Sequence, residues 1–424
     1  METWKRLGAA AAAAAFLMIG ASGLEADGSP PGLTLKQCID ISLARNPLWL
    51  SAEEDYQASL ARVRQAKEFP QPSLDYDSDL QPKLLDFRGS GESYFGVSQT
   101  IEFPGRRSLR GKIAASESRE VLADKDILRL DVVFQVKEAF YAILLAEERC
   151  KYAAQDLDLA RDFLEKAQAK YEAGDVAKLE VARAAVEASK AATALKLAEN
   201  DVLLAKARLN YLLGRAKLDP LEIQGGLARA PLPIDRAALV ERALRSRPEI
   251  ARVQASLQKE SRRKSDAALS YLPDFDLSAS RHRLVGEATT WDFTLSFPIP
   301  LFFWQPARGR MAEARANIRS LERRSEDLAN RIALEVAEAC FNARTAADRI
   351  ALFEKEILAP AEEVYDLVLF SFQEGETSGI ELIEARRSLL EARRAYADAL
   401  YDHSLTIAAL ERTVGGPLEG VPHE

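Results

Sequence analysis

The stretch that decides the fold is residues 73–80, which read SLDYDSDL. Apolar and polar side chains alternate along it, which is the period of a β-strand whose two faces meet different surroundings. Tyr76 lies on the apolar face, whereas Asp75, Asp77 and Asp79 lie on the other. The sequence therefore predicts a strand with one apolar and one acidic face.

Three further segments alternate in the same way, at residues 93–103, 274–280 and 291–299. Their aromatic side chains Phe95, Phe275, Trp291 and Phe293 fall on the apolar faces, opposite polar faces that include Asp276 and Asp292. His282 follows on the polar side of the third segment. We expect four amphipathic strands, separated from helices by prolines at the segment ends.

Helices of unusual length follow each pair of strands. Residues 106–172 contain no proline, so they predict a helix of about 100 Å. Gly174 is placed to end this helix, and a second helix returns to Gly214. The second half repeats the pattern with a helix over 307–373, a turn at Gly375 and a return to Gly415. We expect two long antiparallel helical hairpins.

The chain reads as one unit written twice. Gly174 and Gly375 lie 201 positions apart, and so do Gly214 and Gly415. The expected organisation is a first repeat over residues 33–214, a Pro/Gly-rich linker over 215–233, a second repeat over 234–415 and a tail over 416–424. Each repeat contains, in order, a helical segment, two strands and a long hairpin, and the first of these helical segments covers residues 34–69.

Residues 1–26 have the features of a signal peptide. Lys5 and Arg6 precede the apolar stretch 7–19, which is shorter than the roughly 20 residues that a membrane-spanning helix needs. Cleavage is expected near Asp27, and Cys38 does not stand in the context of a lipid-acylated cysteine. We expect an exported protein with no lipid anchor and no transmembrane helix.

The composition excludes several classes of function. A net charge of -8 leaves no basic excess for nucleic acid. Three cysteines (Cys38, Cys150 and Cys340) and three histidines are too few and too scattered for a disulfide scaffold or a metal site. No nucleophile elbow, phosphate loop or metal-ligand cluster is present, so we expect neither an enzyme nor a cofactor.

Two interpretations fit the strands. They are either part of an ordinary half-buried sheet or part of a transmembrane barrel, in which about ten tilted residues cross the membrane. The sheet has no evident helical cover, and four strands are too few for a barrel, which needs at least about eight. A barrel would therefore be shared by several chains. Its lipid-facing residues would be Tyr76, Phe95, Phe275, Trp291 and Phe293, and its lumen residues Asp75, Asp77, Asp79, Asp276 and Asp292.

Several segments, in this duplicated order, resemble the TolC-type outer membrane efflux channels. They are residues 96–107 (GVSQTIEFPGRR), 295–303 (LSFPIPLFF, including Pro-Ile-Pro-Leu-Phe), 170–174, 372–375 and 410–415. The resemblance implies a mainly α protein with transmembrane β structure. In it, three chains give four strands each to a 12-stranded barrel, and their hairpins form a periplasmic tunnel. It also implies a periplasmic adaptor and an inner-membrane transporter of the RND type as partners, and the strand endings are most similar to the heavy-metal (CzcC-like) branch.

The resemblance places an acidic ring at the periplasmic entrance. Glu381 and Glu384 lie just past the second turn and share a helix face. Three copies would bring six carboxylates around one axis and favour cations. The plainer interpretation of both glutamates is a solvated helix surface. The first repeat has Glu180 and Arg183 at the equivalent positions, so the charge pattern is not duplicated there.

The hairpin turns are the expected adaptor contacts, although a glycine turn needs no partner to explain it. The residues concerned are Tyr171, Gly174 and Asp175 in the first turn and Phe372, Gly375 and Glu376 in the second. A basic group, Arg106, Arg107, Arg110 and Lys112, follows the second strand and fits either anionic head groups or a solvated helical turn.

Efflux of metal ions or small molecules is therefore the expected function. A type I protein secretion channel and a periplasmic coiled-coil adaptor remain as alternatives. An adaptor would contain one hairpin flanked by compact β domains, and not two hairpins alternating with strand pairs. The exported substrate, whether metal ion, drug or polypeptide, is open at this point.

Overall fold

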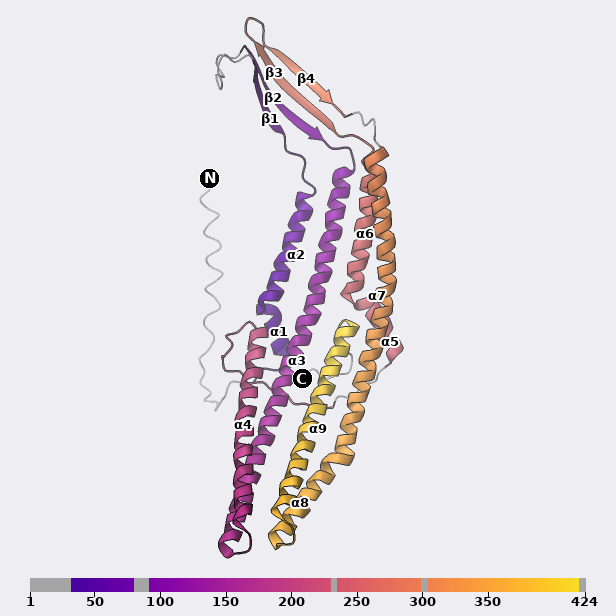
Figure 1. The fold of residues 1–424 in the computed structure, drawn as a ribbon. Helices are drawn as coiled ribbons and strands as arrows, with labels where there is room; N and C mark the ends of the chain where they lie inside the picture. Colours follow the sequence, from indigo (N-terminus) through magenta and orange to yellow (C-terminus); the bar gives the residue numbers. More distant parts are fainter. Residues whose placement is uncertain (1–31, 80–90, 230–234, 299–303, 419–424) are drawn as a thin grey trace, which may run out of the picture.

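The computed structural model describes residues 32–79, 91–229, 235–298 and 304–418. The expected signal peptide, 1–26, and the cleavage site near Asp27 lie outside the described residues. The molecule is elongated, with a β-sheet at one end and the turns of two helical hairpins at the other (Figure 1). No helix in the described part of the chain has both the length and the apolar character needed to cross a membrane.

Four strands form one antiparallel sheet in the order β1-β2-β3-β4. Their bounds are β1 Ser73–Asp79, β2 Glu92–Ile101, β3 Phe275–Leu284 and β4 Thr290–Ser296. The predicted bounds differ slightly from these, since Leu80 lies outside the described residues, β2 ends two residues before Phe103, and β3 continues to Leu284, past the predicted end at 280.

The register keeps most like side chains together, although Arg281 lies between Phe95 and Trp291 on the apolar face. Tyr76 pairs with Phe95, and Ala279 pairs with Phe293. On the other face, Asp276 lies between Thr100 and Ser296. Because a shift of one residue would move every side chain to the opposite face, this register fixes the separation of apolar and polar faces.

Shorter helices lie in pairs beside the upper parts of the long ones (Figure 1). They are α1 Leu35–Arg45, α2 Pro47–Gln65, α5 Arg236–Ser246 and α6 Pro248–Leu269. The prediction of one helical segment over 34–69 is wrong at Pro47, which begins a new helix because its ring has no N–H to continue the first. Asn46 caps α2 through its side-chain oxygen.

The first hairpin consists of α3, Arg106–Ala173, and α4, Lys178–Leu212. The second consists of α7 Trp304–Leu352, the π-helical turn η1 Phe353–Ile357, α8 Leu358–Glu374 and α9 Gly379–Val414. Gly174 and Gly375 end α3 and α8 with φ of 87° and 82°, a left-handed conformation that glycine adopts without strain.

The π-helical turn corrects the prediction of an uninterrupted helix over 307–373. Pro360 follows the turn by three residues and has no N–H to donate to the preceding helical turn. A π turn holds one residue more than an α turn. Val136 and Val336 are 200 positions apart above this point, whereas Gly174 and Gly375 are 201 apart below it. The π turn therefore accommodates one extra residue in the second hairpin.

The core is distributed along the helices and not gathered in one centre. One cluster joins α1, α3 and α4 around Cys38, Val136 and Leu209, and a second joins α5, α7 and α9 around Val336 and Leu410. A third cluster links the two hairpins close to their turns. The three cysteines are free; Cys38 and Cys340 are buried, whereas Cys150 is only half-buried.

Candidate channel wall, gate and periplasmic tips

The polar face of the sheet is held by hydroxyl groups that donate to its carboxylates. Ser98 donates to Asp75 at 2.6 Å, and Thr100 donates to Asp276 at 2.6 Å. Of the predicted lumen residues, Asp75, Asp77, Asp79 and Asp276 are exposed, and Asp292 is half-buried. All five lie on this one face, which is therefore acidic along its whole length.

A small network lies at the end of the sheet farthest from the helices. The Tyr94 hydroxyl donates to Glu92 at 2.6 Å, and the Nε2 atom of His282 lies 2.8 Å from the same carboxylate. The rings of Tyr94 and His282 are stacked with centroids 4.3 Å apart. Within the described residues, no group of three His, Cys, Asp or Glu side chains is arranged to hold a metal ion.

The opposite face of the sheet exposes its aromatic side chains. Tyr76, Phe95, Trp291 and Phe293 are 49%, 53%, 65% and 76% exposed, and Phe275 is half-buried. Isolated apolar residues are common on protein surfaces, but a contiguous patch of this kind marks a contact with a membrane or another protein.

The two hairpin turns differ in what they expose. Tyr171 is 44% exposed, and Asp175 and Glu376 are also exposed. Phe372, which the sequence groups with them, is only 5% exposed because its ring packs edge-on against Phe163 at 5.4 Å. Phe372 therefore joins the two hairpins to each other and is not an accessible contact in this chain.

Two further contacts hold the turns together. The Lys170 ammonium donates to the Phe372 carbonyl at 2.7 Å and lies over its ring. Gly379 begins α9 against Glu180, where an added Cβ would lie 2.7 Å from the carboxylate Oε2 and 3.0 Å from the Phe163 ring. The second hairpin can approach this closely because residue 379 has no side chain.

The candidate gate residues Glu381 and Glu384 are both exposed on the first turns of α9. No cation among the described residues forms an ion pair with either carboxylate. Their first-hairpin equivalents behave differently, since Arg183 pairs with Glu180 at 2.9 Å. At these equivalent positions, the exposed carboxylates without a described cation partner therefore belong to the second hairpin.

A buried ionic network, which sequence reasoning missed, joins the hairpins above the turns. Arg386 lies 3.4 Å from Asp156 and 3.1 Å from Glu187, and the three side chains are only 10–13% exposed. Burial raises the pKa of Asp156, although Arg386 opposes this effect. The available signal was an arginine among the buried positions of α9, beside Leu382, Ala385 and Leu389.

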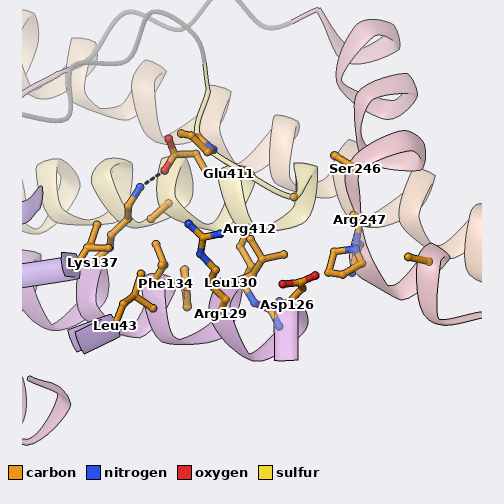
Figure 2. A pocket seen from close by; sticks show the side chains of 18 of the residues that line it. Leu43, Asp126, Arg129, Leu130, Phe134, Lys137, Ser246, Arg247, Glu411 and Arg412 are labelled. Atoms are coloured by element: carbon orange, nitrogen blue, oxygen red, sulfur yellow. Dashed lines mark hydrogen bonds and ion pairs between the residues drawn. The ribbon is translucent and has the colours of Figure 1, made fainter. Parts of the chain in front are cut away.

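A cavity of about 1030 Å³ lies between this network and the sheet, bounded by α1 and α3 of the first half and α6 and α9 of the second. Figure 2 shows its labelled side chains, with Lys137 directed at Glu411. This ion pair is almost fully buried, and Arg412 makes a second link to Asp131 at 2.7 Å. The cavity thus lies between the two halves of the chain, and these two ion pairs join α3 of the first half to α9 of the second beside it.

Both halves of the chain match one known protein family. The family model described as outer membrane efflux protein matches residues 38–215 and 239–416. The chain belongs to this family. Members of the family are channel proteins of the outer membrane and not enzymes. This agrees with the resemblance found in the sequence and argues against the alternative that the chain is a periplasmic adaptor.

Two relatives and one solved structure resemble this efflux protein along most of its length. The cobalt-zinc-cadmium resistance protein CzcC of Cupriavidus metallidurans is 26% identical over 401 residues, 90% of each chain. The pyoverdine export outer membrane protein OpmQ of Pseudomonas aeruginosa is 24% identical and covers 85% of this chain and 81% of its own. The solved structure of the outer-membrane channel OprN has a TM-score of 0.76 at 20% identity, covering 90% of each chain, and shows the same fold.

The basic group of the efflux protein after β2 divides into two kinds. Arg106 pairs with Asp274 and donates to the Leu272 carbonyl, and Arg110 pairs with Glu102. These two arginines hold the end of the sheet to the helices. Arg107 and Lys112 have no carboxylate partner among the described residues, so only they remain available to an external anion.

Proposed function

We propose that this outer membrane efflux protein acts as a homotrimer, in which each chain contributes four strands to a 12-stranded barrel. The observation that supports this best is the two-faced sheet with its exposed aromatic face. β1 and β4 are its outer strands, and the described residues provide neither with a second neighbour. Because unpaired backbone groups are costly in lipid, a second copy pairing β4 with β1 would satisfy both edges.

The helices have corresponding free edges. α4 exposes Leu197 and Leu204, at 63% and 61%, and α8 exposes Leu367 and Phe370, at 61% and 62%. These two apolar faces belong to different helices, so a contact between them is head-to-tail, and it forms a ring when the rotation from copy to copy closes. In the proposed trimer, the hairpins of three chains enclose one periplasmic tunnel.

We propose metal cations or small molecules as the exported substrates, passed on by an inner-membrane RND-type transporter and a periplasmic adaptor. The relatives named for cobalt, zinc and cadmium resistance and for pyoverdine export support these two classes. A passive channel imposes little chemistry of its own. Deleting the gene should lower the inhibitory concentration of zinc, cobalt or cadmium if metals are the substrate. Unchanged tolerance to these metals, together with loss of a secreted polypeptide, would indicate the secretion channel instead.

We propose Glu381 and Glu384 as a carboxylate ring at the tunnel entrance. Replacing both by glutamine would remove six charges from the trimer while keeping side-chain size. The change should reduce cation over anion selectivity in planar lipid bilayers. Glu391→Gln on the same helix removes three charges from the trimer, so it is the matched control for Glu381→Gln alone and should have a smaller effect than that variant. Equal effects at both places would assign selectivity to the tunnel wall as a whole and contradict an entrance ring.

We propose Tyr171, Asp175 and Glu376 as the adaptor contacts, because they are exposed where the chain projects farthest from the sheet. Gly174 and Gly375 shape the two turns. Asp175→Trp and Glu376→Trp should lower cross-linking to the adaptor and abolish resistance, while trimer yield stays unchanged. Normal resistance in both variants would remove the turns from the contact surface.

A further inference from the structure

A second cavity of about 1030 Å³ lies where the sheet meets the helices, between the end of β2, the start of α3 and the segment that follows α2. Its walls combine apolar and basic side chains. Phe69 and Ile101 line it and are 70% and 44% exposed, and Lys67, Arg107 and Lys112 bring three cations to it. A site with both characters fits an amphiphilic anion.

The three cations have no partner of opposite charge. Among the described residues, the nearby carboxylate Glu102 is already paired with Arg110, and no carboxylate forms an ion pair with Lys67, Arg107 or Lys112. The Arg107 guanidinium lies 3.6 Å from the centre of the Phe69 ring. This contact orients the arginine but leaves its positive charge uncompensated.

Gly111 positions one of these cations. A Cβ on residue 111 would lie 2.8 Å from Cγ and 3.1 Å from Cε of Lys67, so the lysine stem crosses α3 where the helix has no side chain. For the corresponding Gly309 of the second half, no heavy atom of the described residues lies within 4 Å of such a Cβ. The arrangement is therefore specific to the first half, although both halves carry a basic-Gly-basic sequence.

The cavity also adjoins the face proposed to meet lipid. Ile101 is the last residue of β2 and lies on the same face as Phe95 and Val97. Just beyond it, α3 begins at Arg106 after the N-cap Gly105, which provides no side-chain cap. The Arg106 N–H donates to the Phe103 carbonyl, and the other N–H groups of the first turn favour a negative group. Apolar chains lying along the strand face would bring a lipid head group to this position.

We propose that this cavity binds the phosphate head group of an anionic phospholipid, phosphatidylglycerol or a similar lipid, in the periplasm-facing leaflet. Lys67, Arg107 and Lys112 contact the phosphate, and Phe69 and Ile101 contact the start of the acyl chains. The site rests on the proposed membrane orientation of the sheet. It would hold the barrel at a set height in the membrane, with the helices below the lipid.

The test is native mass spectrometry of the full-length protein in detergent, titrated with phosphatidylglycerol or with phosphatidylcholine of the same acyl chains. The wild type should bind phosphatidylglycerol at least about tenfold more tightly. Each cation removed should weaken this binding about fivefold. The variant Lys67→Gln/Arg107→Gln/Lys112→Gln should therefore lose the preference. Lys264→Gln/Arg308→Gln/Arg310→Gln, which removes the same charge from other basic positions, should keep it.

Two further arms separate a lipid from a free anion. Glycerol phosphate at millimolar concentration should not displace the lipid, and Phe69→Ala should weaken phosphatidylglycerol binding. Equal affinity for the two lipids, displacement by glycerol phosphate, or equal losses in the two triple variants would overturn the inference. Trimeric mass in the same spectra tests the proposed function separately, since a trimer without lipid preference contradicts only the lipid site.

Discussion

The buried Arg386 network provides the sharpest test of how the two hairpins are joined. Arg386→Ala would leave Asp156, whose side chain is only 10% exposed, without an ion-pair partner among the described residues, whereas Glu187 would keep Lys190 at 2.9 Å. Breaking a buried ion pair by removing one partner costs about 3–5 kcal/mol. Because burial already raises the pKa of Asp156, proton uptake by this carboxyl would offset part of the loss. We therefore expect about 3 kcal/mol.

Hydrogen exchange of the detergent-solubilised protein measures this local stability. A loss of about 3 kcal/mol corresponds to roughly 150-fold faster hydrogen exchange at amides whose exchange requires the two hairpins to separate at Arg386. The increase should appear in peptides from α3 and α9 on both sides of the contact. The sheet should be unaffected, because it lies at the other end of the molecule (Figure 1).

The adjacent Arg387 is the matched control. Its side chain is 58% exposed and its guanidinium lies 3.9 Å from Glu187, so Arg387→Ala should cost at most about 1 kcal/mol. Adding Asp156→Asn to Arg386→Ala should recover part of the loss, because it removes one uncompensated charge. Equal exchange in the two arginine variants would refute a stabilising role for the buried network.

Two other variants and one labelling experiment test separate parts of the structure. In Gly379→Ala, the added methyl group should contact Glu180 and Phe163 and push the two hairpin turns apart. The resting conductance in planar bilayers should therefore increase, and an unchanged current would show that the close approach is not needed to keep the channel closed. Burial, and then the nearby Arg229, lower the pKa of His403 below 6.5. Its contribution to stability is therefore present above pH 6.5 and is lost as pH falls toward the folded-state pKa. His403→Gln should make the melting temperature less dependent on pH between pH 7 and 5, and an unaltered pH profile would contradict this assignment. Burial raises the pKa of the Cys38 thiol to about 11, so maleimide at pH 7 should leave it unmodified until the protein unfolds, and rapid labelling of the native protein would contradict its burial.

The sequence predicts those features that depend on local pattern. Alternation of aspartate with aromatic residues fixes the two faces of each strand, and the register keeps these faces together. Gly174 and Gly375 mark the turns because their backbone conformation is left-handed. Both signals lie within a few residues, so no tertiary information is needed to read them.

The remaining features depend on how distant segments dock. Phe372 is buried because Phe163 of the other hairpin meets it, and Arg386 is buried because Asp156 and Glu187 compensate its charge. These partners are about 200 positions apart, beyond the reach of periodicity. The π turn before Pro360 is an intermediate case, because the proline is visible in the sequence but the way in which the helix absorbs it is not.

The proposed function depends most on three copies of this chain sharing one barrel. Multi-angle light scattering of the protein extracted from outer membranes in detergent measures this directly, after correction for bound detergent. We expect the mass of three mature chains. A single-chain mass, or a protein that stays dissolved after the detergent is removed, would contradict the account.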